Sequence, residues 1–375
     1  MEQNIKSTNA SRKLHRVNWD NIQKSKEYSV LGLMSGTSLD GLDMAICKFT
    51  YDGENWLGAI LEADTVEYKP DLKQRLSESM ILSALSLSLL DQELGLYMGE
   101  QSRKFLEKKR LNIDFIASHG HTVFHQPERS LTVQIGNPAA IAVHSGLPTV
   151  ADFRRVDLAH GGQGAPLVPF GDLLLFAEYP NCLNLGGVAN ITLHASEQIS
   201  AFDICPANMT LNYLAQKEGK EYDKGGQMSS TGALNEGLLT ELNSLPYFTK
   251  LAPKSLGREW FETEFLPLLE NSGLSNRDLM RTCVEHIAIQ ISNSTRANEG
   301  KTLVTGGGAF NDFLIKRLRK LNTSEIHVPD NKMIQFKEAY VFAFLGLMRW
   351  FGANNTIPQV TGARKASSGG AVYLP

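Results

Sequence analysis

A strand pattern interrupted by a glycine-rich turn occurs twice in this chain, at corresponding places in its two halves. In the first half, apolar runs at 28–34 and 42–50 flank a turn rich in Ser, Gly and Thr. In the second half, short strand patterns flank the turn Asn184-Leu-Gly-Gly-Val-Ala-Asn190. Each hairpin opens the order β-β-β-α-β, so the sequence predicts two related α/β domains. A repeat on the scale of a domain constrains the fold more than any single motif does.

Further patterns complete each half. In the first half we expect a third strand at 57–68, a helical region at 71–109 and a strand at 114–118. In the second half the expected strands are 182–185, 191–195, 199–204 and 302–305, and the expected helices are 206–217, 279–296, 312–321 and 337–351. These patterns predict a polar, basic N-terminal arm at 1–27, a first domain at 28–150 with 348–375, and a second domain at 151–347.

The glycine turns have the composition of phosphate-binding loops. Glycine lets the backbone approach a ligand closely, and Ser and Thr add hydroxyl and main-chain N–H donors. In the first hairpin the candidate nucleotide-binding residues are Gly36, Thr37, Ser38, Leu39, Asp40, Gly41, Leu42 and Asp43. The second hairpin offers Gly186, Gly187 and Asn190, and a third turn offers Gly306, Gly307 and Gly308. A plain turn remains the alternative, because single glycine motifs are weak.

Length and composition limit the class of protein. The chain has 375 residues and 42% hydrophobic content, which is enough for two cores. A net charge of -3 provides no electrostatic footprint for nucleic acid or an anionic membrane, so we expect a small-molecule ligand. The cysteines form no paired motif and favour a reducing cytosol. Since no apolar run is long enough to cross a bilayer, we expect a cytoplasmic protein.

Two such halves, each presenting a glycine hairpin to a ligand in the cleft between them, resemble the actin-like (RNase H-like) ATPase and sugar kinase superfamily. Over nearly all of its length after the arm, the chain also resembles the anhydro-N-acetylmuramic acid kinase family. The motifs that carry this resemblance are Gly32-Leu-Met-Ser-Gly-Thr-Ser-Leu-Asp-Gly-Leu-Asp43, Ser118-His-Gly120, Val133-Gln-Ile-Gly-Asn-Pro138, Val150-Ala-Asp-Phe-Arg-Arg155, Gly161-Gly-Gln-Gly-Ala-Pro-Leu-Val-Pro169, Asn184 to Asn190, Gly306-Gly-Gly-Ala-Phe-Asn311, Lys337-Glu-Ala339 and Val360-Thr-Gly-Ala363.

The resemblance implies a reaction in which ATP, Mg²⁺ and water convert 1,6-anhydro-N-acetylmuramic acid to N-acetylmuramic acid 6-phosphate and ADP, in peptidoglycan recycling. Water attacks the anomeric carbon, so one carboxylate must accept its proton opposite the departing oxygen, as in an inverting glycosidase. The departing O6 receives the γ-phosphoryl group, which needs positioning and charge neutralisation. The family commonly forms homodimers, and the resemblance implies a homodimer here. The sequence does not identify the metal ligands.

Two carboxylates are the catalytic candidates. Asp203 ends the predicted strand at 199–204, ahead of a helix, and matches the family's catalytic motif. Without the family, a helix N-cap is the alternative for this aspartate. Glu338, at the predicted start of the helix at 337–351, resembles a family glutamate near the attacking water and the sugar. A favourable interaction with the helix macrodipole is its alternative.

The substrate-binding candidates are polar side chains within the shared motifs. They are His119, Asn137, Arg154, Arg155, Gln163 and Asn208. Guanidinium groups bind carboxylates in a bidentate manner and this substrate carries a lactyl carboxylate, so we expect Arg154 or Arg155 to face it. Lys254 and Arg258 are similar candidates, with surface solvation as the alternative.

The chain departs from the family at two places. Asp203-Ile-Cys-Pro-Ala-Asn208 stands where the family more often has Asp-Thr-Gly-Pro-Gly-Asn, which puts a side chain where glycine would admit a ligand. An exposed Cys205 would be open to alkylation, whereas a buried thiol would fill space. His121 replaces a glutamine. Together with His119 and His125 it suggests a metal site, but no carboxylate or cysteine joins them at ligand spacing.

Two other functions are compatible with the same sequence. A related kinase of different sugar specificity would keep the fold without opening a ring. The altered residues 204–207 also suit a nucleotide-dependent binding protein with little turnover.

Overall fold

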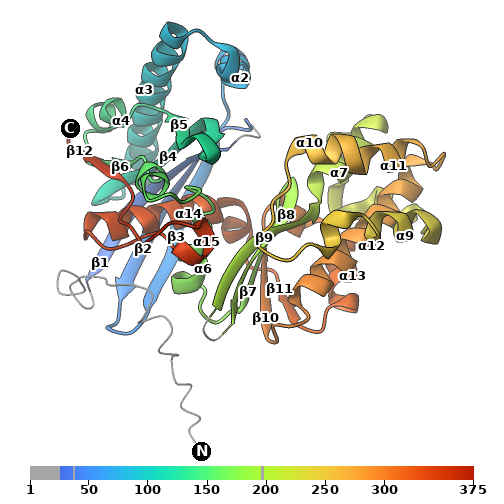
Figure 1. Cartoon of the computed structure of the whole chain (residues 1–375). Coiled ribbons are helices and arrows are strands. Elements are labelled where there is room, and N and C mark those ends of the chain that lie inside the picture. The colour runs from blue at the N-terminus through green and yellow to red at the C-terminus, as the bar shows by residue number, and fades with distance from the viewer. Residues whose placement is uncertain (1–25, 37–38, 196–197) are drawn as a thin grey trace, which may run out of the picture. The chain divides into compact units, whose positions relative to one another are not determined.

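The structure, a computed structural model, describes residues 26–36, 39–195 and 198–375. The chain divides into two compact units (Figure 1): unit 1 comprises Met1–Leu175 and Phe336–Pro375, and unit 2 comprises Phe176–Gln335. Almost all of the predicted arm lies outside the described residues. Among the helices that are described, none combines the length and the apolar character needed to cross a bilayer.

The limits of the units differ from the predicted domains at 28–150 with 348–375 and at 151–347. Residues 151–175 belong to unit 1, and strand β6 (Thr149–Ala151) pairs with β4 (Phe115–Gln126) in the sheet of that unit. Helix α14 (Asn331–Trp350) begins before the predicted residue 337, and its residues from Phe336 onward belong to unit 1.

Seven strands form the sheet of unit 1, in the order β12-β6-β4-β1-β2-β3, with β5 paired to β4. Strands β1 to β3 form an antiparallel meander, whereas β4 runs parallel to β1 and β6 parallel to β4. The bounds of the other strands are β1 (Glu27–Ser35), β2 (Leu42–Tyr51), β3 (Trp56–Val66), β5 (Leu131–Ile135) and β12 (Ala371–Tyr373). The predicted first hairpin is therefore present between β1 and β2.

Where one helical region is predicted at 71–109, the structure has two helices and a break. Helix α2 (Pro70–Ser77) is followed by a 3-10 turn, η2 (Ser79–Ile81), before α3 (Ala84–Lys109) begins. Ser83 stops a continuous helix because it adopts an extended conformation and its hydroxyl accepts a hydrogen bond from Ser86 N at 3.1 Å, capping α3. The other helices of unit 1 are α4 (Pro138–Ser145), α5 (Arg155–Ala159), α6 (Val168–Leu175) and α15 (Pro358–Thr361), with the short turn η3 (Pro127–Arg129).

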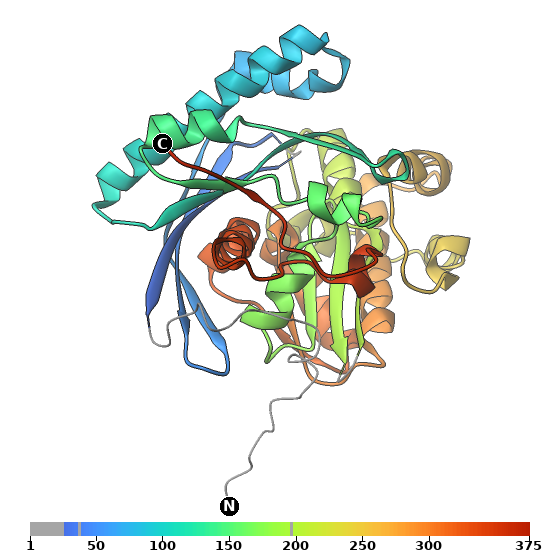
Figure 2. The ribbon, with the colours of Figure 1, turned by 60° about the vertical axis from the view of Figure 1, so that its left-hand side comes forward.

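The sheet of unit 1 is covered on both faces (Figure 2). Alternate residues of β1, among them Leu31 and Leu33, belong to a core with Leu94 of α3 and Ile141 of α4. The residue between them, Gly32, faces α14 on the opposite side. This alternation follows from the two-residue period of a strand, and it explains why β1 is apolar over its central residues, 30–34.

Helix α14 lies against the sheet so closely that several positions admit only glycine. A Cβ atom on Gly32 would lie 2.0 Å from the carbonyl oxygen of Ala339. A Cβ on Gly58 would lie 2.1 Å from Tyr340 Oη, and one on Gly346 would lie 2.6 Å from the Cβ of Ala117. The close approach fixes the depth and position of α14 on this face.

The sheet of unit 2 repeats the same arrangement. Its order is β11-β10-β7-β8-β9, with β7 to β9 as an antiparallel meander and β10 and β11 continuing parallel to β7. This is the order β6-β4-β1-β2-β3 of unit 1, which confirms the repeat predicted from the sequence. The bounds are β7 (Asn181–Leu185), β8 (Val188–Ala195), β9 (Gln198–Pro206), β10 (Lys301–Thr305) and β11 (Glu325–His327).

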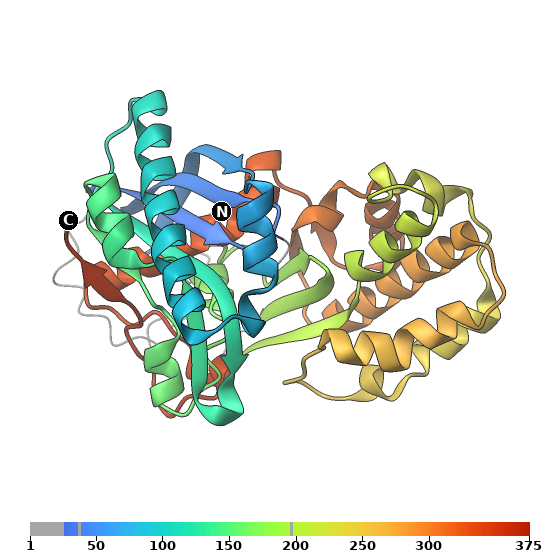
Figure 3. The same ribbon diagram turned by 90° about the horizontal axis from the view of Figure 1, so that it is seen from above.

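Helices gather beside the sheet of unit 2 (Figure 3), with α12 (Asn276–Thr295) buried along much of its length. It contacts α7 (Asn208–Lys217), α9 (Glu236–Asn243) and α13 (Asp312–Leu321) around one apolar core. The remaining elements are η4 (Lys224–Gly226), α8 (Gln227–Thr231), η5 (Pro246–Thr249), α10 (Arg258–Trp260), η6 (Phe261–Phe265), α11 (Leu266–Glu270) and η7 (Gly307–Phe310).

One added methyl group at Gly32 should destabilise unit 1, because the Ala339 carbonyl belongs to a buried helix backbone that cannot move aside. We expect Gly32→Ala to lower the free energy of unfolding, measured in urea, by about 3 kcal/mol. Gly237→Ala in α9 is the control, since a Cβ there would approach only Asn235 Oδ1, at 3.3 Å. Unchanged stability of Gly32→Ala would contradict the close packing of α14.

Candidate active site

Three polar residues form a row across the sheet of unit 2, and we call Asn184, Asn190 and Asp203 the polar row. Asn190 of β8 is the register partner of both Asn184 on β7 and Asp203 on β9. Directly opposed side chains share a face, with Cβ atoms about 4.5–5.5 Å apart. Flanking residues of the same strands, among them Leu183 and Ile191, belong to the core. The polar row therefore lies on the sheet face away from this core.

Asp203 is held by one backbone hydrogen bond to its carboxylate. Leu256 N donates to Asp203 Oδ2 at 2.9 Å. Burial raises the pKa of the half-buried Asp203 carboxyl, and the Leu256 N–H opposes this shift. The alternative of a helix cap is wrong, because α7 begins at Asn208 and its N-cap residue is Ala207. The described contacts leave Oδ1 available for proton transfer.

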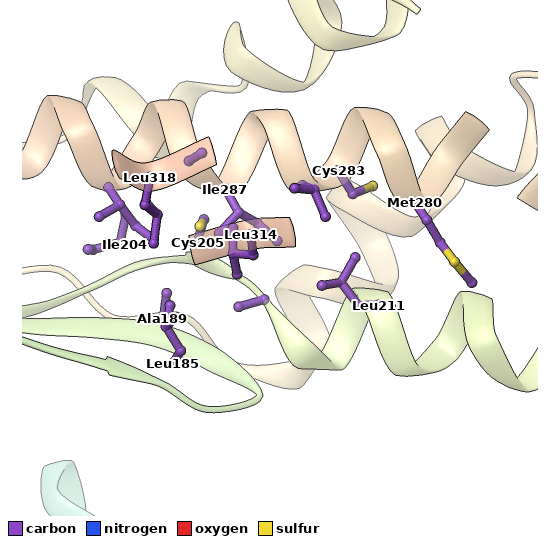
Figure 4. Close-up of a cluster of buried hydrophobic side chains, with 14 of the residues drawn as sticks. Leu185, Ala189, Ile204, Cys205, Leu211, Met280, Cys283, Ile287, Leu314 and Leu318 are labelled. Carbon is purple, nitrogen blue, oxygen red and sulfur yellow. The ribbon is translucent and has the colours of Figure 1, made fainter. Parts of the chain in front are cut away.

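A β-bulge explains how the chain accommodates its departures from the family. Asn190 pairs with Asp203 but Ala189 pairs with Cys205, so Ile204 is an extra residue in β9. Both Ile204 and Cys205 are buried in the core of unit 2, where Figure 4 shows them near Ile287, Leu314 and Leu318.

The bulge therefore turns both side chains inward and away from the polar row. Cys205 is therefore a buried thiol that fills space and not an exposed one open to alkylation. Burial raises its pKa far above the ordinary value. The other three cysteines, Cys47, Cys182 and Cys283, are buried as well.

The second glycine hairpin is joined to the start of α7. The carbonyl oxygen of Gly187 accepts hydrogen bonds from Ala207 N at 2.8 Å and Met209 N at 3.0 Å, and that of Gly186 accepts from Asn208 N at 3.1 Å. These bonds satisfy N–H groups that a helix N-terminus otherwise leaves open. The carbonyls of the hairpin are thus directed at α7.

Asn208 lies where two glycine turns meet. Its Nδ2 donates to Leu185 O at 3.0 Å, and a Cβ on Gly308 would lie 3.1 Å from its Oδ1. Gly306 has a φ of +81°, and a Cβ there would lie 2.4 Å from Asn184 Oδ1. A Cβ on Gly307 would meet only Asn208 Nδ2, at 3.7 Å. The structure brings the predicted second and third turns together in unit 2.

The first glycine hairpin, in unit 1, is described in part. Thr37 and Ser38 lie outside the described residues. Leu39 N donates to Gly36 O at 3.3 Å, and Leu39 has a left-handed φ of 58°. Asp40 is exposed.

Two further residues of this hairpin are explained by packing. A Cβ on Gly41 would lie 2.5 Å from Val66 O. Leu42 belongs to the core of unit 1, so that only its backbone is available to a ligand.

Asp43 and Glu338 place two carboxylates near each other in unit 1. Burial raises the pKa of Asp43 to about 6, the hydrogen bond from Thr65 opposes the shift, and Glu338 adds to it. Thr65 Oγ1 donates to Asp43 Oδ1 at 2.6 Å. The Glu338 side chain reaches solvent. Partial burial nevertheless raises the pKa of its carboxyl, and the charges of Arg154 and, to a smaller extent, Lys337 oppose this shift.

The expectation that Glu338 stands at a helix start is wrong. Helix α14 begins at Asn331, so Glu338 lies two turns inside it, beyond the reach of the macrodipole at the first turn. Its neighbour Lys337 is buried and forms an ion pair with the buried Asp172 of α6 at 2.6 Å. Glu338 is therefore presented by a fixed part of the helix.

Arg154 and Arg155 have different surroundings. Arg155 is exposed and pairs with Asp152 at 3.1 Å. Arg154 is half-buried, and its Nε and Nη2 lie 3.2 Å and 2.7 Å from His119 Nε2, while its Nη1 donates to Gly164 O at 2.7 Å. Burial lowers the pKa of Arg154 to about 10, and Glu338 opposes this, so the guanidinium is charged near neutral pH.

His119 is a neutral acceptor beside this charge. Its Nδ1 lies 2.9 Å from Gly120 O, which assigns the ring proton to Nδ1 and leaves Nε2 to accept from Arg154. Burial and the charge of Arg154 lower the pKa of His119 well below its ordinary range. Arg154 is thus positioned by uncharged groups, and its own charge is available to an anion.

The three predicted histidines do not gather a metal site. His121 Nδ1 lies 3.1 Å from Ser35 Oγ, which also accepts from Tyr68 Oη at 2.7 Å, and His125 Nδ1 lies 3.2 Å from Thr132 Oγ1. Across the described ranges, no group of three or more His, Cys, Asp and Glu side chains is placed to hold a metal ion.

Asn137 and Gln163 have mainly structural contacts. Asn137 caps α4, with Oδ1 accepting from Ala139 N at 3.0 Å and Ala140 N at 3.1 Å, so capping accounts for this residue. Gln163 is exposed, and its backbone N donates to Thr361 O at 2.7 Å.

Lys254 and Arg258, the two further candidates for the lactyl carboxylate, also have different surroundings. Lys254 is half-buried, and its backbone is bonded to Asp203. Arg258 is exposed and pairs with Glu262 at 2.8 Å.

Sequence reasoning missed the buried carboxylate that orders the loop around Arg154. Asp157 accepts from Gly164 N and Thr361 Oγ1, each at 2.8 Å. It thereby holds the carbonyl of Gly164 that binds Arg154. Thr361 lies within the motif Val360 to Ala363, and Asp157 follows the motif that ends at Arg155 by two residues. The motifs therefore point to these parts of the chain, but the sequence does not show that the two residues are in contact.

The repeated strand order, with a glycine hairpin between the first two strands of each meander, is the fold that the sequence predicts, that of the actin-like ATPases and sugar kinases. Residues 28–375 match the family model for anhydro-N-acetylmuramic acid kinase. This chain belongs to the anhydro-N-acetylmuramic acid kinase family, as the sequence motifs predict.

Individual relatives match over almost the whole chain. The anhydro-N-acetylmuramic acid kinase of Pasteurella multocida is 37% identical over 366 residues, covering 92% of this chain and 96% of that protein. That of Vibrio parahaemolyticus is 37% identical over 364 residues, covering 92% and 97%. Among solved structures, the activator of the 2-hydroxyisocaproyl-CoA dehydratase from Clostridium difficile with bound ADPNP has a TM-score of 0.42 at 14% identity, covering 85% of this chain and 94% of that one.

Replacing Asp43 by Asn should stabilise the protein near neutral pH. Folding raises the pKa of Asp43 from 3.8 to about 6. The charged carboxylate therefore destabilises the folded state above about pH 6, and this cost disappears below pH 3.8, where the group is protonated in both states. In urea denaturation, Asp43→Asn should gain about 2 kcal/mol at neutral pH, and the gain should shrink toward zero near pH 4. A loss of stability at neutral pH would contradict the assigned burial of this charge.

Proposed function

We propose that this chain is an ATP-dependent kinase that hydrolyses the 1,6-anhydro bridge of anhydro-N-acetylmuramic acid and phosphorylates O6. The products are N-acetylmuramic acid 6-phosphate and ADP. Within the family established above, one observation carries the chemistry: Asp203 is a half-buried carboxylate with one oxygen held by Leu256 N–H and the other available. Because the bulge at Ile204 and Cys205 faces the core, these departures give no reason to expect lost turnover.

In this mechanism Asp203 is the general base. Water attacks the anomeric carbon while Asp203 accepts its proton, and the bond from that carbon to O6 breaks on the opposite face. Partial burial favours the protonated form of the base, which brings its pKa closer to the working pH. Electrons of the broken bond pass to O6, which takes the γ-phosphoryl group in place of a proton. Asn190, the nucleotide-binding candidate of the second hairpin, lies directly opposite Asp203.

In unit 1, Arg154 is proposed to bind the lactyl carboxylate. The guanidinium is charged, half-buried and held by uncharged His119 and Gly164 O, and a bidentate pair with a carboxylate suits its planar fork. Arg155 is excluded from this role in the proposal, since it already pairs with Asp152. Glu338, near Arg154, is proposed to assist in holding the water or a sugar hydroxyl.

In unit 2 the hairpin at Gly186 and the turn at Gly306 are proposed to bind ATP through backbone N–H groups, and in unit 1 the hairpin at Gly36 is proposed to bind phosphate in the same way. Mg²⁺ would supply charge neutralisation on the phosphates when bound. Asp43 is the proposed carboxylate for this cation. It is half-buried and its pKa is raised, and a bound cation would lower that pKa. Magnesium takes one or two carboxylates together with waters and phosphates, and in this proposal Asp43 is one such carboxylate.

The biological setting follows from the substrate. Anhydro-N-acetylmuramic acid is a cell-wall fragment, and an ATP-consuming enzyme that returns it to metabolism would serve peptidoglycan recycling in the cytoplasm. A homodimer is the proposed oligomer, on the resemblance of the sequence to its family.

The proposal is tested by identifying the product. Purified enzyme with ATP, Mg²⁺ and anhydro-N-acetylmuramic acid should release ADP and form N-acetylmuramic acid 6-phosphate, detected by mass spectrometry and ³¹P NMR. Intact N-acetylmuramic acid and hexoses should not stimulate ADP release. Activity confined to the intact sugars would assign a kinase of different specificity and overturn the proposed reaction.

Asp203→Asn tests whether Asp203 is the general base. The amide cannot accept the proton, and loss of a general base lowers kcat about 10²–10⁴-fold. ATP affinity, measured by calorimetry, should be nearly unchanged. A near-normal rate would remove Asp203 from the mechanism.

A further inference from the structure

A short segment of unit 2, residues 254–256, lies along the outer edge of the strand that carries Asp203. Strand β9 is the last strand of its sheet, and β8 occupies only one of its edges. On the other edge, Asp203 N donates to Lys254 O at 3.1 Å, and Leu256 N donates to Asp203 Oδ2 at 2.9 Å. The segment therefore binds both the backbone and the carboxylate of the same aspartate.

Tyr247 joins this segment to strand β9. Its Oη donates to Asp203 O at 2.6 Å, and its ring packs against Trp260, with ring centres 5.2 Å apart. The ammonium of Lys254 lies over the Tyr247 ring, 4.7 Å from its centre, and 5.8 Å from the centre of the Phe202 ring. Lys254 Nζ also donates to Tyr247 O at 3.4 Å. Cation–π contact and hydrogen bonds thus join Tyr247 to residues 254–256.

We propose that Tyr247 and residues 254–256 form a strap that fixes the orientation of the Asp203 carboxylate, with Tyr247 and Lys254 as positioning residues. The proposal rests on the proposed function, in which Asp203 is the base. Neither residue touches the reacting atoms in this account. Tyr247 acts through its hydrogen bond to the Asp203 carbonyl and its contact with Lys254. Lys254 acts through its backbone bond to Asp203 and the nearby N–H group of Leu256, which engages Oδ2 and leaves Oδ1 for the water.

The strap should influence both the position and the proton affinity of Asp203. A hydrogen bond from Leu256 N favours the charged carboxylate, so a loosened strap raises the pKa of Asp203. The neighbouring groups Tyr247 and Cys205 both have pKa values raised by burial far above neutral, so they are uncharged. Burial lowers the pKa of Lys254, and the charge of Lys250 adds to this shift. A shift of the acid limb between the parent and a strap variant is therefore assigned to Asp203, because the carboxyls of Asp43 and Glu338 in unit 1 are the same in both proteins.

The experiment compares the strap with a matched pair in the same unit. Tyr247→Phe removes one hydroxyl, and Lys254→Met removes one charge while keeping chain length. Lys217 lies 4.5 Å from the centre of the Tyr213 ring, and Tyr213 Oη donates to Glu270. Tyr213→Phe and Lys217→Met therefore make the same chemical changes away from Asp203.

In each strap variant kcat should fall about tenfold, because a small misplacement of the base is costly. The acid limb of the kcat profile should move to higher pH by about half a unit. KM for ATP should stay within about twofold, since the hairpins are untouched. The control variants should match the parent in all three measurements. An unchanged acid limb and kcat in both Tyr247→Phe and Lys254→Met would overturn the strap.

A direct titration separates failure of the strap from failure of the proposed function. The carboxyl of Asp203 is followed by ¹³C NMR, with Asp203→Asn used to assign its signal, so that no turnover is needed. A higher pKa in Tyr247→Phe supports the strap even if the anhydrosugar proves not to be the substrate. An unchanged pKa in a folded Tyr247→Phe protein overturns it even if the parent enzyme forms the expected product.

Discussion

Helix α14 approaches strand β1 so closely that the carbonyl of Ala339 takes the space of a side chain at position 32. This contact fixes the helix on the sheet of unit 1, and the buried pair of Lys337 with Asp172 fixes its rotation nearby. Glu338, between these two anchors, is thereby held near Asp43 and Arg154. The placement of these polar groups in unit 1 therefore depends on how closely α14 packs against β1.

In unit 2 the corresponding constraint is the alternation of the meander. Apolar residues such as Leu183 and Ile191 face the core, which leaves the polar row on the other face. The bulge at Ile204 interrupts the alternation once and directs Cys205 into the core, while Asp203 stays on the sheet face away from that core. An edge strand with a bulge needs support on its free side, and the segment 254–256 supplies it.

The repeat, the two sheets and the family were predictable from sequence, because strand alternation and glycine hairpins are local patterns. Contacts that position the candidate side chains were not, because they join distant parts of the chain. Tyr247 and Asp203 are 44 residues apart, and Thr361 and Asp157 are 204 apart. The sequence could not separate Arg154 from Arg155 either, since adjacent residues of the same type differ only in what surrounds them. The structure separates them by their surroundings, with His119 beside Arg154 and Asp152 beside Arg155.

The central claim is that water attacks the anomeric carbon, with Asp203 as its base, while O6 takes the phosphoryl group. Turnover in H₂¹⁸O, followed by rapid borohydride reduction and mass spectrometry, locates the oxygen that water supplies. We expect one ¹⁸O at C1 of the product and none in its phosphate. Label in the phosphate group, or an unlabelled C1, would contradict attack at the anomeric carbon.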